Sequence, residues 1–146
     1  MSVDNLNRKI LKCLQQNARQ SNAEIGRQVG ISSPAVSERI KKMEDAGIIE
    51  SYNTLVSPYE MGYQLKAIVT LRAFMGKLKP FLNKVKTFDE VINCYRITGD
   101  ENIVMEVVLK NHNHLEAFID QLIIYGESKT QIVLSDIVKL NEVKAI

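Results

Sequence analysis

Apolar positions between residues 4 and 47 recur at helical spacing in three short groups. An interval of three or four residues puts side chains on one face of a helix, so each group predicts a short amphipathic helix. The first group can be capped by Asp4 or Asn5. The apolar positions of the three groups are, in order, Leu6, Ile10, Cys13 and Leu14; Ile25 and Val29; and Val36, Ile40 and Met43. Together they predict a three-helix unit with one small core.

Capping residues mark the ends of the second and third helices. Ser21 and Glu24 have the spacing of a capping box, in which each side chain accepts a hydrogen bond from the other residue's backbone N–H. Gly30 follows the second helix and favours the left-handed conformation needed there. Ser33, ahead of a proline suited to the first turn, is the expected cap of the third helix, and Gly47 ends it. Two helices and a tight turn thus occupy residues 21–47.

The outer face of the third helix carries polar and basic side chains. A helix that enters the DNA major groove needs small polar residues near its N-terminus and cations to meet phosphates. We expect residues 33–46 to be such a helix. The candidates for contacts with base edges are Ser33, Ser37, Glu38 and Lys41, and those for phosphate contacts are Arg27, Arg39 and Lys42. The alternative is a small helical domain whose charged face is merely solvated.

Residues 48–56 have the composition of a strand, and the segments from residue 65 onwards have the patterns of further strands and helices. Ile48–Val56 is rich in β-formers and is expected to be an extended strand between two domains, with the boundary marked by Pro58 and Gly62. The later elements are expected at Leu65–Ala73 (strand), Leu78–Val85 (helix), Val91–Thr98 (strand), Ile103–Lys110 (strand), Leu115 to near Gly126 (helix) and Thr130–Leu140 (strand). The order βαββαβ is that of a ferredoxin-like fold.

One face of this sheet is expected to lack helices. Right-handed crossovers put both helices on the same face, so the other face stays open. Its candidate apolar residues are Ile68, Val104, Val108, Val133 and Ile137. An open apolar sheet face predicts a dimer interface.

Composition narrows the class of protein. The 146 residues carry a formal net charge of +2, so DNA binding would depend on local clusters of cations rather than on overall charge. The first nine residues lack the apolar core of a signal peptide and no apolar run matches a membrane span, which favours the cytoplasm. Cys13 and Cys94 are expected to be isolated core residues. His112 and His114 are two apart and complete no metal site, and no motif of an enzyme is present.

The turn at residues 99–102 has two interpretations. Glycine, aspartate and asparagine are common in hairpin turns because they tolerate unusual backbone angles. Exposed backbone N–H groups and a carboxylate are also suited to holding the charged ends of a free amino acid. The residues alone favour the ordinary turn.

The whole chain resembles the leucine-responsive regulator/AsnC family of transcription factors. The resemblance rests on four segments: LNRKILKCLQQNAR, NAEIGRQVGISSPAVSERIKKMEDAGII, ESYNTLVSP and the turn TGDEN. It implies a winged helix–turn–helix joined by a strand to a small-molecule-sensing α/β domain, and dimers that commonly assemble into octamers.

The family also implies an amino acid effector bound between dimers. On this sequence the effector cleft would comprise Thr98, Gly99, Asp100 and Asn102, with Tyr125 and Thr130 from a neighbouring subunit. Many members have an acidic residue at the position of Asn102, and an amide does not neutralise an ammonium group.

We therefore expect an α+β protein with two domains, a DNA-binding domain at residues 3–64 and a ferredoxin-like effector-binding and oligomerisation domain at 65–146. The expected function is regulation of transcription at a pseudo-palindromic operator, with no cofactor beyond an unidentified amino acid. The alternative is a metabolic amino-acid sensor whose helical domain contacts protein rather than DNA.

Overall fold

The computed structural model describes residues 3–146, which divide into two compact units. The first comprises the described residues up to Thr54 together with the C-terminal segment Val138–Ile146. The second comprises Leu55–Ile137. The division expected from sequence, at residue 65, kept the C-terminal segment in the second domain, whereas the structure groups that segment with the N-terminal helices.

Three helices form the first unit, as the apolar spacing predicts: α1 (Asn5–Gln16), α2 (Asn22–Val29) and α3 (Ser33–Asp45). No strand is assigned among residues 3–54, so the unit contains no β-wing of its own. Its core consists of side chains from all three helices, namely Ile10, Cys13, Ile25, Val36 and Met43. Such a small core gives limited stability by itself, so polar contacts at helix ends matter here.

Two of the predicted caps are present and one is shifted. Asp4 Oδ1 accepts a hydrogen bond from the Asn7 N–H at 2.7 Å, and both halves of the Ser21–Glu24 capping box form. The cap of α3 is Ser32, whose Oγ accepts from the Ala35 N–H at 3.4 Å. The prediction of Ser33 is therefore wrong by one residue. Adjacent serines offer the same side chain, and only the extended backbone at residue 32 selects the cap.

The turn between α2 and α3 depends on a glycine inside α2. The N–H groups of Gly30 and Ile31 both donate to the Gly26 carbonyl oxygen, at 2.8 and 3.0 Å. A Cβ at position 26 would lie 2.5 Å from the Ile31 carbonyl oxygen, closer than real Cβ atoms come to backbone. Gly30 has the left-handed φ of 82° expected of it, with open space around it. Gly26 thus permits the close approach, and Gly30 permits the reversal of the chain.

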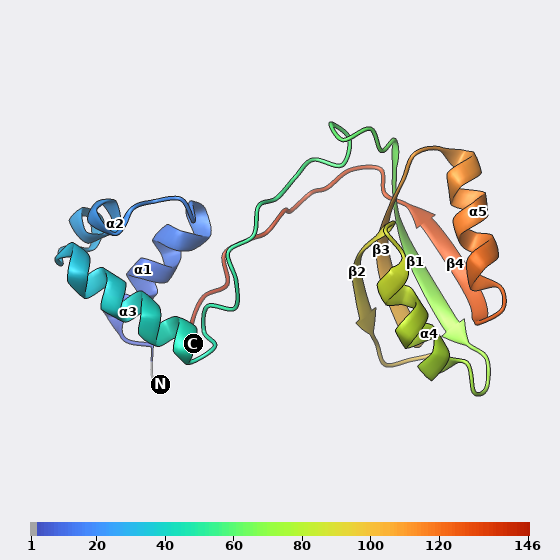
Figure 1. Cartoon of the computed structure of the whole chain (residues 1–146), viewed down its shortest axis with the longest axis horizontal. Coiled ribbons are helices and arrows are strands. Elements are labelled where there is room, and N and C mark those ends of the chain that lie inside the picture. Colours follow the sequence, from blue (N-terminus) through green and yellow to red (C-terminus); the bar gives the residue numbers. More distant parts are fainter. Residues whose placement is uncertain (1–2) are drawn as a thin grey trace. The chain divides into compact units, whose positions relative to one another are not determined.

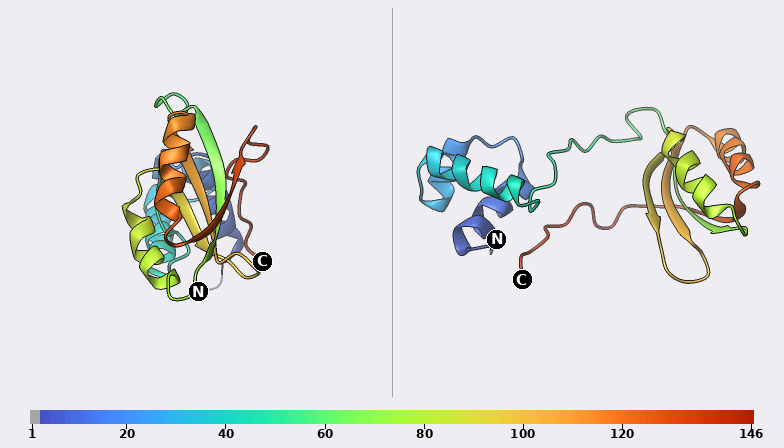
Figure 2. Two further views of the ribbon diagram at one scale, coloured as in Figure 1. Left: turned by 90° about the vertical axis from the view of Figure 1, so that its right-hand side faces the viewer. Right: turned by 60° about the horizontal axis from the view of Figure 1, so that its bottom comes forward.

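The second unit is a four-stranded antiparallel sheet with two helices, and the predicted βαββαβ order is confirmed. The strand order is β2-β3-β1-β4. Both helices lie on one face of the sheet (Figures 1 and 2). The elements are β1 (Leu65–Ala73), α4 (Leu78–Lys84), the 3-10 turn η1 (Val85–Thr87), β2 (Val91–Arg96), β3 (Ile103–Leu109), α5 (His112–Leu122) and β4 (Gly126–Ile132).

Alternation along β1 and β3 separates a covered face from an open one. The covered face packs against Phe81 of α4 and Phe118 of α5, both fully buried, and contains Ala67, Val69, Leu71, Ile103, Met105, Val107 and Leu109. On the open face, register places Ile68 beside Glu106 and Val108 beside Lys66. Lys66 forms ion pairs with Glu106 at 2.6 Å and Asp136 at 2.7 Å. The open face therefore mixes apolar side chains with ion pairs, and Ile137 lies beyond the end of β4.

Two predicted strands differ in the structure. Ile48–Val56 forms no strand: Ile48 and Ile49 pack against the helical core, and the following residues are exposed. An extended segment becomes a strand only with a neighbour to pair with, and within the described chain this segment has none. The last strand is β4, Gly126–Ile132, rather than Thr130–Leu140. Its pairing with β1 starts at Gly126, opposite Ala73, and ends where Val133 N donates to Lys66 O.

Gly26→Ala is expected to destabilise the helical unit by about 2 kcal/mol, because the added Cβ meets backbone that cannot yield without shifting α3. The gain in helix propensity, at most about 1 kcal/mol, does not offset this. Gly30→Ala is the matched comparison and is expected to cost about 1 kcal/mol, from backbone strain alone. Denaturant-dependent amide exchange of peptides from α1–α3 measures both. Equal stability of Gly26→Ala and wild type would contradict the close approach.

Candidate nucleic-acid interface and effector site

The outer face of α3 presents four of the predicted DNA contacts to solvent. Ser37, Glu38, Lys41 and Lys42 are exposed, whereas Ser33, the first residue of the helix, is half-buried. Lys42 Nζ lies 2.7 Å from Glu38 Oε1, one helical turn away. The hydrogen bond from Lys42 holds the pKa of Glu38 below its ordinary value. The pair is exposed to solvent, so its two side chains can separate when a stronger partner for either arrives.

Arg39 turns away from this face and holds α3 against the start of α1. Its Nη1 donates to Asp4 Oδ2 at 2.7 Å and to Asn7 Oδ1 at 2.9 Å. The Asn7 N–H and the Arg39 guanidinium together keep the pKa of Asp4 below its ordinary value. Asn7 is only 1% exposed, and Arg39 satisfies its carbonyl oxygen. Of the three predicted phosphate contacts, Arg39 is thus held by a residue of α1 and by the N-cap of that helix, whereas Lys42 forms only the exposed pair with Glu38 on its own helix.

Two further predicted DNA contacts are the cations Arg27 and Lys41. Arg27 lies exposed in the last turn of α2. Lys41 is exposed and forms no ion pair with any residue that the structure describes. A free ammonium beside small polar side chains on an exposed helix is the arrangement that fits a groove flanked by phosphates. Local cations rather than net charge therefore define this candidate interface.

The hairpin turn between β2 and β3 is fixed in place by Asn102. Its N–H donates to the Leu71 carbonyl oxygen at 2.9 Å, and its own carbonyl oxygen accepts from the Ile97 N–H at 2.9 Å. Its side-chain Oδ1 accepts from the Ala73 N–H at 2.7 Å. These bonds join the turn to the end of β1. The side-chain oxygen of Asn102 is consequently occupied by a backbone N–H, which sequence reasoning did not foresee.

The other predicted residues of the turn are exposed. Thr98, Gly99 and Asp100 all face solvent, and Gly99 adopts a left-handed φ of 112°. Next to them, Glu101 forms an ion pair with Lys129 of β4 at 2.6 Å. The turn thus leaves one carboxylate, that of Asp100, outside any ion pair among the described residues.

Tyr125 lies at the same end of the sheet, and Thr130 lies further along β4. The Tyr125 carbonyl oxygen accepts from the Phe74 N–H at 2.9 Å, and its ring packs on Phe81 with centroids 5.4 Å apart. Thr130 is opposite Val69, in the middle of β1. One chain therefore brings Asn102 and Tyr125 to the end of β1, but it does not bring Thr130 to the turn.

His114 and the two cysteines serve packing and local structure. His114 Nδ1 accepts from the Lys110 N–H at 3.1 Å, so its Nε2 carries the proton donated to Glu90, 2.9 Å away. Cys13 is buried and Cys94 half-buried, and both are free thiols. Among residues 3–146 no group of three or more potential metal ligands occurs. None of the helices in this part of the chain is long and apolar enough to span a membrane.

Two family models match the chain in succession. Residues 3–50 match a winged helix-turn-helix DNA-binding domain, and residues 66–143 match the Lrp/AsnC ligand-binding domain. The transcriptional regulator Ptr1 of Methanocaldococcus jannaschii is 36% identical over 83% of this chain and 82% of its own length.

Solved structures agree with these matches over nearly the whole chain. Bacillus subtilis LrpC superposes with a TM-score of 0.90 at 27% identity, covering 94% of this chain and 99% of LrpC. The complex of the regulator NMB0573 from Neisseria meningitidis with L-methionine superposes with a TM-score of 0.91 at 27% identity, covering 97% and 96%. The family consists of DNA-binding regulators of transcription rather than enzymes. This chain belongs to the Lrp/AsnC family of transcriptional regulators.

Proposed function

We propose that this regulator binds a pseudo-palindromic operator as a homodimer, or as an octamer made of four such dimers, in the cytoplasm. The observation that carries the proposal is the outer face of α3, where Ser37, Glu38, Lys41 and Lys42 are exposed on a helix–turn–helix. In the major groove, Glu38 accepts from a cytosine amino group, and Ser33, Ser37 and Lys41 serve other base edges. Lys42 and Arg27 meet phosphates. Two-fold symmetry separates the half-sites by one helical turn or a multiple of it.

Arg39 acts differently in this proposal. Because its guanidinium bonds to Asp4 and Asn7, it contributes to DNA binding by fixing the angle of α3 and reaches phosphate only by giving up those bonds. The dimer forms through the open sheet face, where the half-buried Ile68 and Val104 provide apolar contacts, whereas Val108 is only 3% exposed and is already covered within the chain. The ion pairs of Lys66 make that face selective, since a partner must match charge as well as shape.

Lys42→Ala and Glu38→Ala test the proposed interface and are expected to differ. Loss of Lys42 removes one phosphate contact, so affinity falls for all sequences and the slope of log affinity against log salt decreases by about 1. Loss of Glu38 relaxes the preference at one base pair, because the free energy of binding to the preferred base becomes less favourable by about 1–3 kcal/mol. Salt titrations on a duplex selected from a random library and on random duplex measure both effects.

Two further variants complete that experiment. Lys86→Ala changes the net charge equally but lies in the other unit, and it is expected to leave DNA binding unchanged. The double variant Glu38→Ala/Lys42→Ala separates their ion pair from their contacts with DNA. If both single variants lose the same affinity for selected and random DNA, the assigned roles are wrong.

We also propose that a free amino acid binds at the turn of residues 98–100, between dimers, and alters DNA binding. The support is a turn held rigidly by Asn102 while its backbone N–H groups and the Asp100 carboxylate stay exposed. Asp100 holds the ammonium group, and the turn amides of Thr98 and Gly99 hold the carboxylate. A neighbouring subunit supplies Tyr125 and Thr130. NMB0573, a relative in structure, was solved with L-methionine, which makes methionine the first candidate.

A thermal-shift screen against the twenty amino acids tests the effector. A ligand present at about a hundred times its dissociation constant adds about 2.7 kcal/mol of stability, which is readily measured. Asp100→Asn is expected to abolish the shift, because it removes the charge that pairs with the ammonium group. Asp89→Asn, an exposed carboxylate elsewhere in the same unit, is expected to retain it. An Asp100→Asn protein that keeps the full shift would refute the assigned contact.

Asn102 is proposed to position this turn rather than to bind the effector. Asn102→Ala leaves the Ala73 N–H without its partner, which is expected to cost about 1–3 kcal/mol and to weaken effector binding. Asn102→Asp keeps an acceptor oxygen, so stability and effector binding are expected to stay near wild type. Asn83→Ala, an exposed asparagine on α4, is the control for the loss of an amide. Denaturation and calorimetry measure these effects, and tighter effector binding by Asn102→Asp would indicate a direct charge contact instead.

A further inference from the structure

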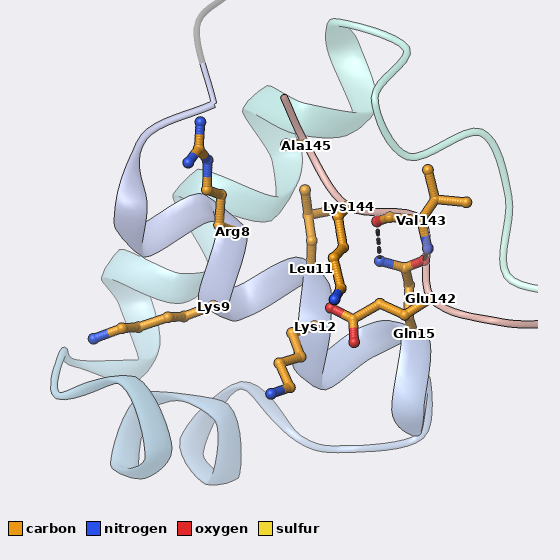
Figure 3. A pocket seen from close by; sticks show the side chains of 9 residues that line it. All are labelled: Arg8, Lys9, Leu11, Lys12, Gln15, Glu142, Val143, Lys144 and Ala145. Atoms are coloured by element: carbon orange, nitrogen blue, oxygen red, sulfur yellow. Dashed lines mark hydrogen bonds between the residues drawn. The ribbon is translucent and has the colours of Figure 1, made fainter.

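The C-terminal segment of the chain lies along α1, and Gln15 joins the two. Gln15 Nε2 donates to the Val143 carbonyl oxygen at 3.0 Å, and the Val143 N–H donates to Gln15 Oε1 at 2.9 Å (Figure 3). One carboxamide thereby satisfies both backbone groups of one residue, as a neighbouring strand would. Arg8 Nη2 adds a third bond, to the Ile146 carbonyl oxygen at 3.2 Å.

The contact at Val143 is made through its backbone. Val143 is 79% exposed, so burial of its side chain contributes little. The groove beside it is lined by Leu11 and Leu14, which are half-buried at the edge of the helical core. A surface that binds the backbone N–H and C=O groups of a segment is suited to an extended peptide rather than to a helix or a small molecule.

We propose that this face of α1 is a docking surface whose partner is the chain's own segment 140–146. The segment is also anchored where it leaves the sheet, because Lys66 pairs with Asp136 at 2.7 Å.

Amide exchange of the full chain tests the docking. Gln15→Ala removes both bonds to Val143, and exchange of the peptide containing Val143 is expected to rise about tenfold, since two neutral hydrogen bonds are lost. Gln16→Ala, the adjacent exposed glutamine with no bond to the segment, is expected to leave exchange unchanged. Equal exchange in the two variants would overturn the proposal.

A second pair of variants leaves α1 untouched. Val143→Pro removes the N–H that donates to Gln15 Oε1. Because the segment is then held less firmly, trypsin is expected to cut after Lys144 several-fold faster. Val143→Ala keeps that N–H and is expected to be cut at the wild-type rate. If the proline variant is cut no faster than the alanine variant, residue 143 is not docked through its backbone.

Discussion

The pairing of β1 with strands on both sides is the constraint on which the second unit depends. Its inward residues meet α4 and α5, and its outward Lys66 joins β3 to the segment after β4. At the C-terminal end of β1, the Ala73 N–H donates to the Asn102 side chain of the turn. The Phe74 N–H, one residue further, donates to the Tyr125 carbonyl oxygen just before β4. A register slip of one residue would expose the core and separate these anchors together. The fixed register of β1 is therefore also what fixes the candidate effector turn.

Local patterns predicted most of the elements because their causes are local. Helical spacing located α1 to α3, alternation located β1 over its observed span, and the Ser21–Glu24 box formed as expected. The strand predictions are wrong where pairing with a residue distant in the sequence determines the structure. Ile48–Val56 has strand-forming residues but no neighbour, and β4 begins where Ala73 offers Gly126 a pairing position.

The candidate sites also depend on contacts between residues that are distant in the sequence, which local patterns do not reveal. Spacing around the third helix identified the exposed polar face, but it could not reveal that Arg39 is bound by Asp4 and Asn7, more than thirty residues earlier. Likewise, the turn at Thr98 to Asn102 was found from composition, whereas the bond from Ala73 to the Asn102 side chain depends on tertiary structure. In both places one polar side chain orients an element, and its exposed neighbours remain available for a ligand.

The same separation of roles applies to position 102, where this chain has asparagine and the resemblance to the family implies an acidic residue in many members. An acidic residue and an asparagine both offer an oxygen that accepts from the Ala73 N–H, so the exchange preserves the geometry of the turn while removing one negative charge. The Asp100 carboxylate then becomes the principal negative charge free to meet an ammonium group, since Glu101 is paired with Lys129. In the proposed effector site, affinity is therefore expected to depend on Asp100 and on the hydrogen bonds that hold the turn. On that proposal, an asparagine at position 102 is compatible with effector binding.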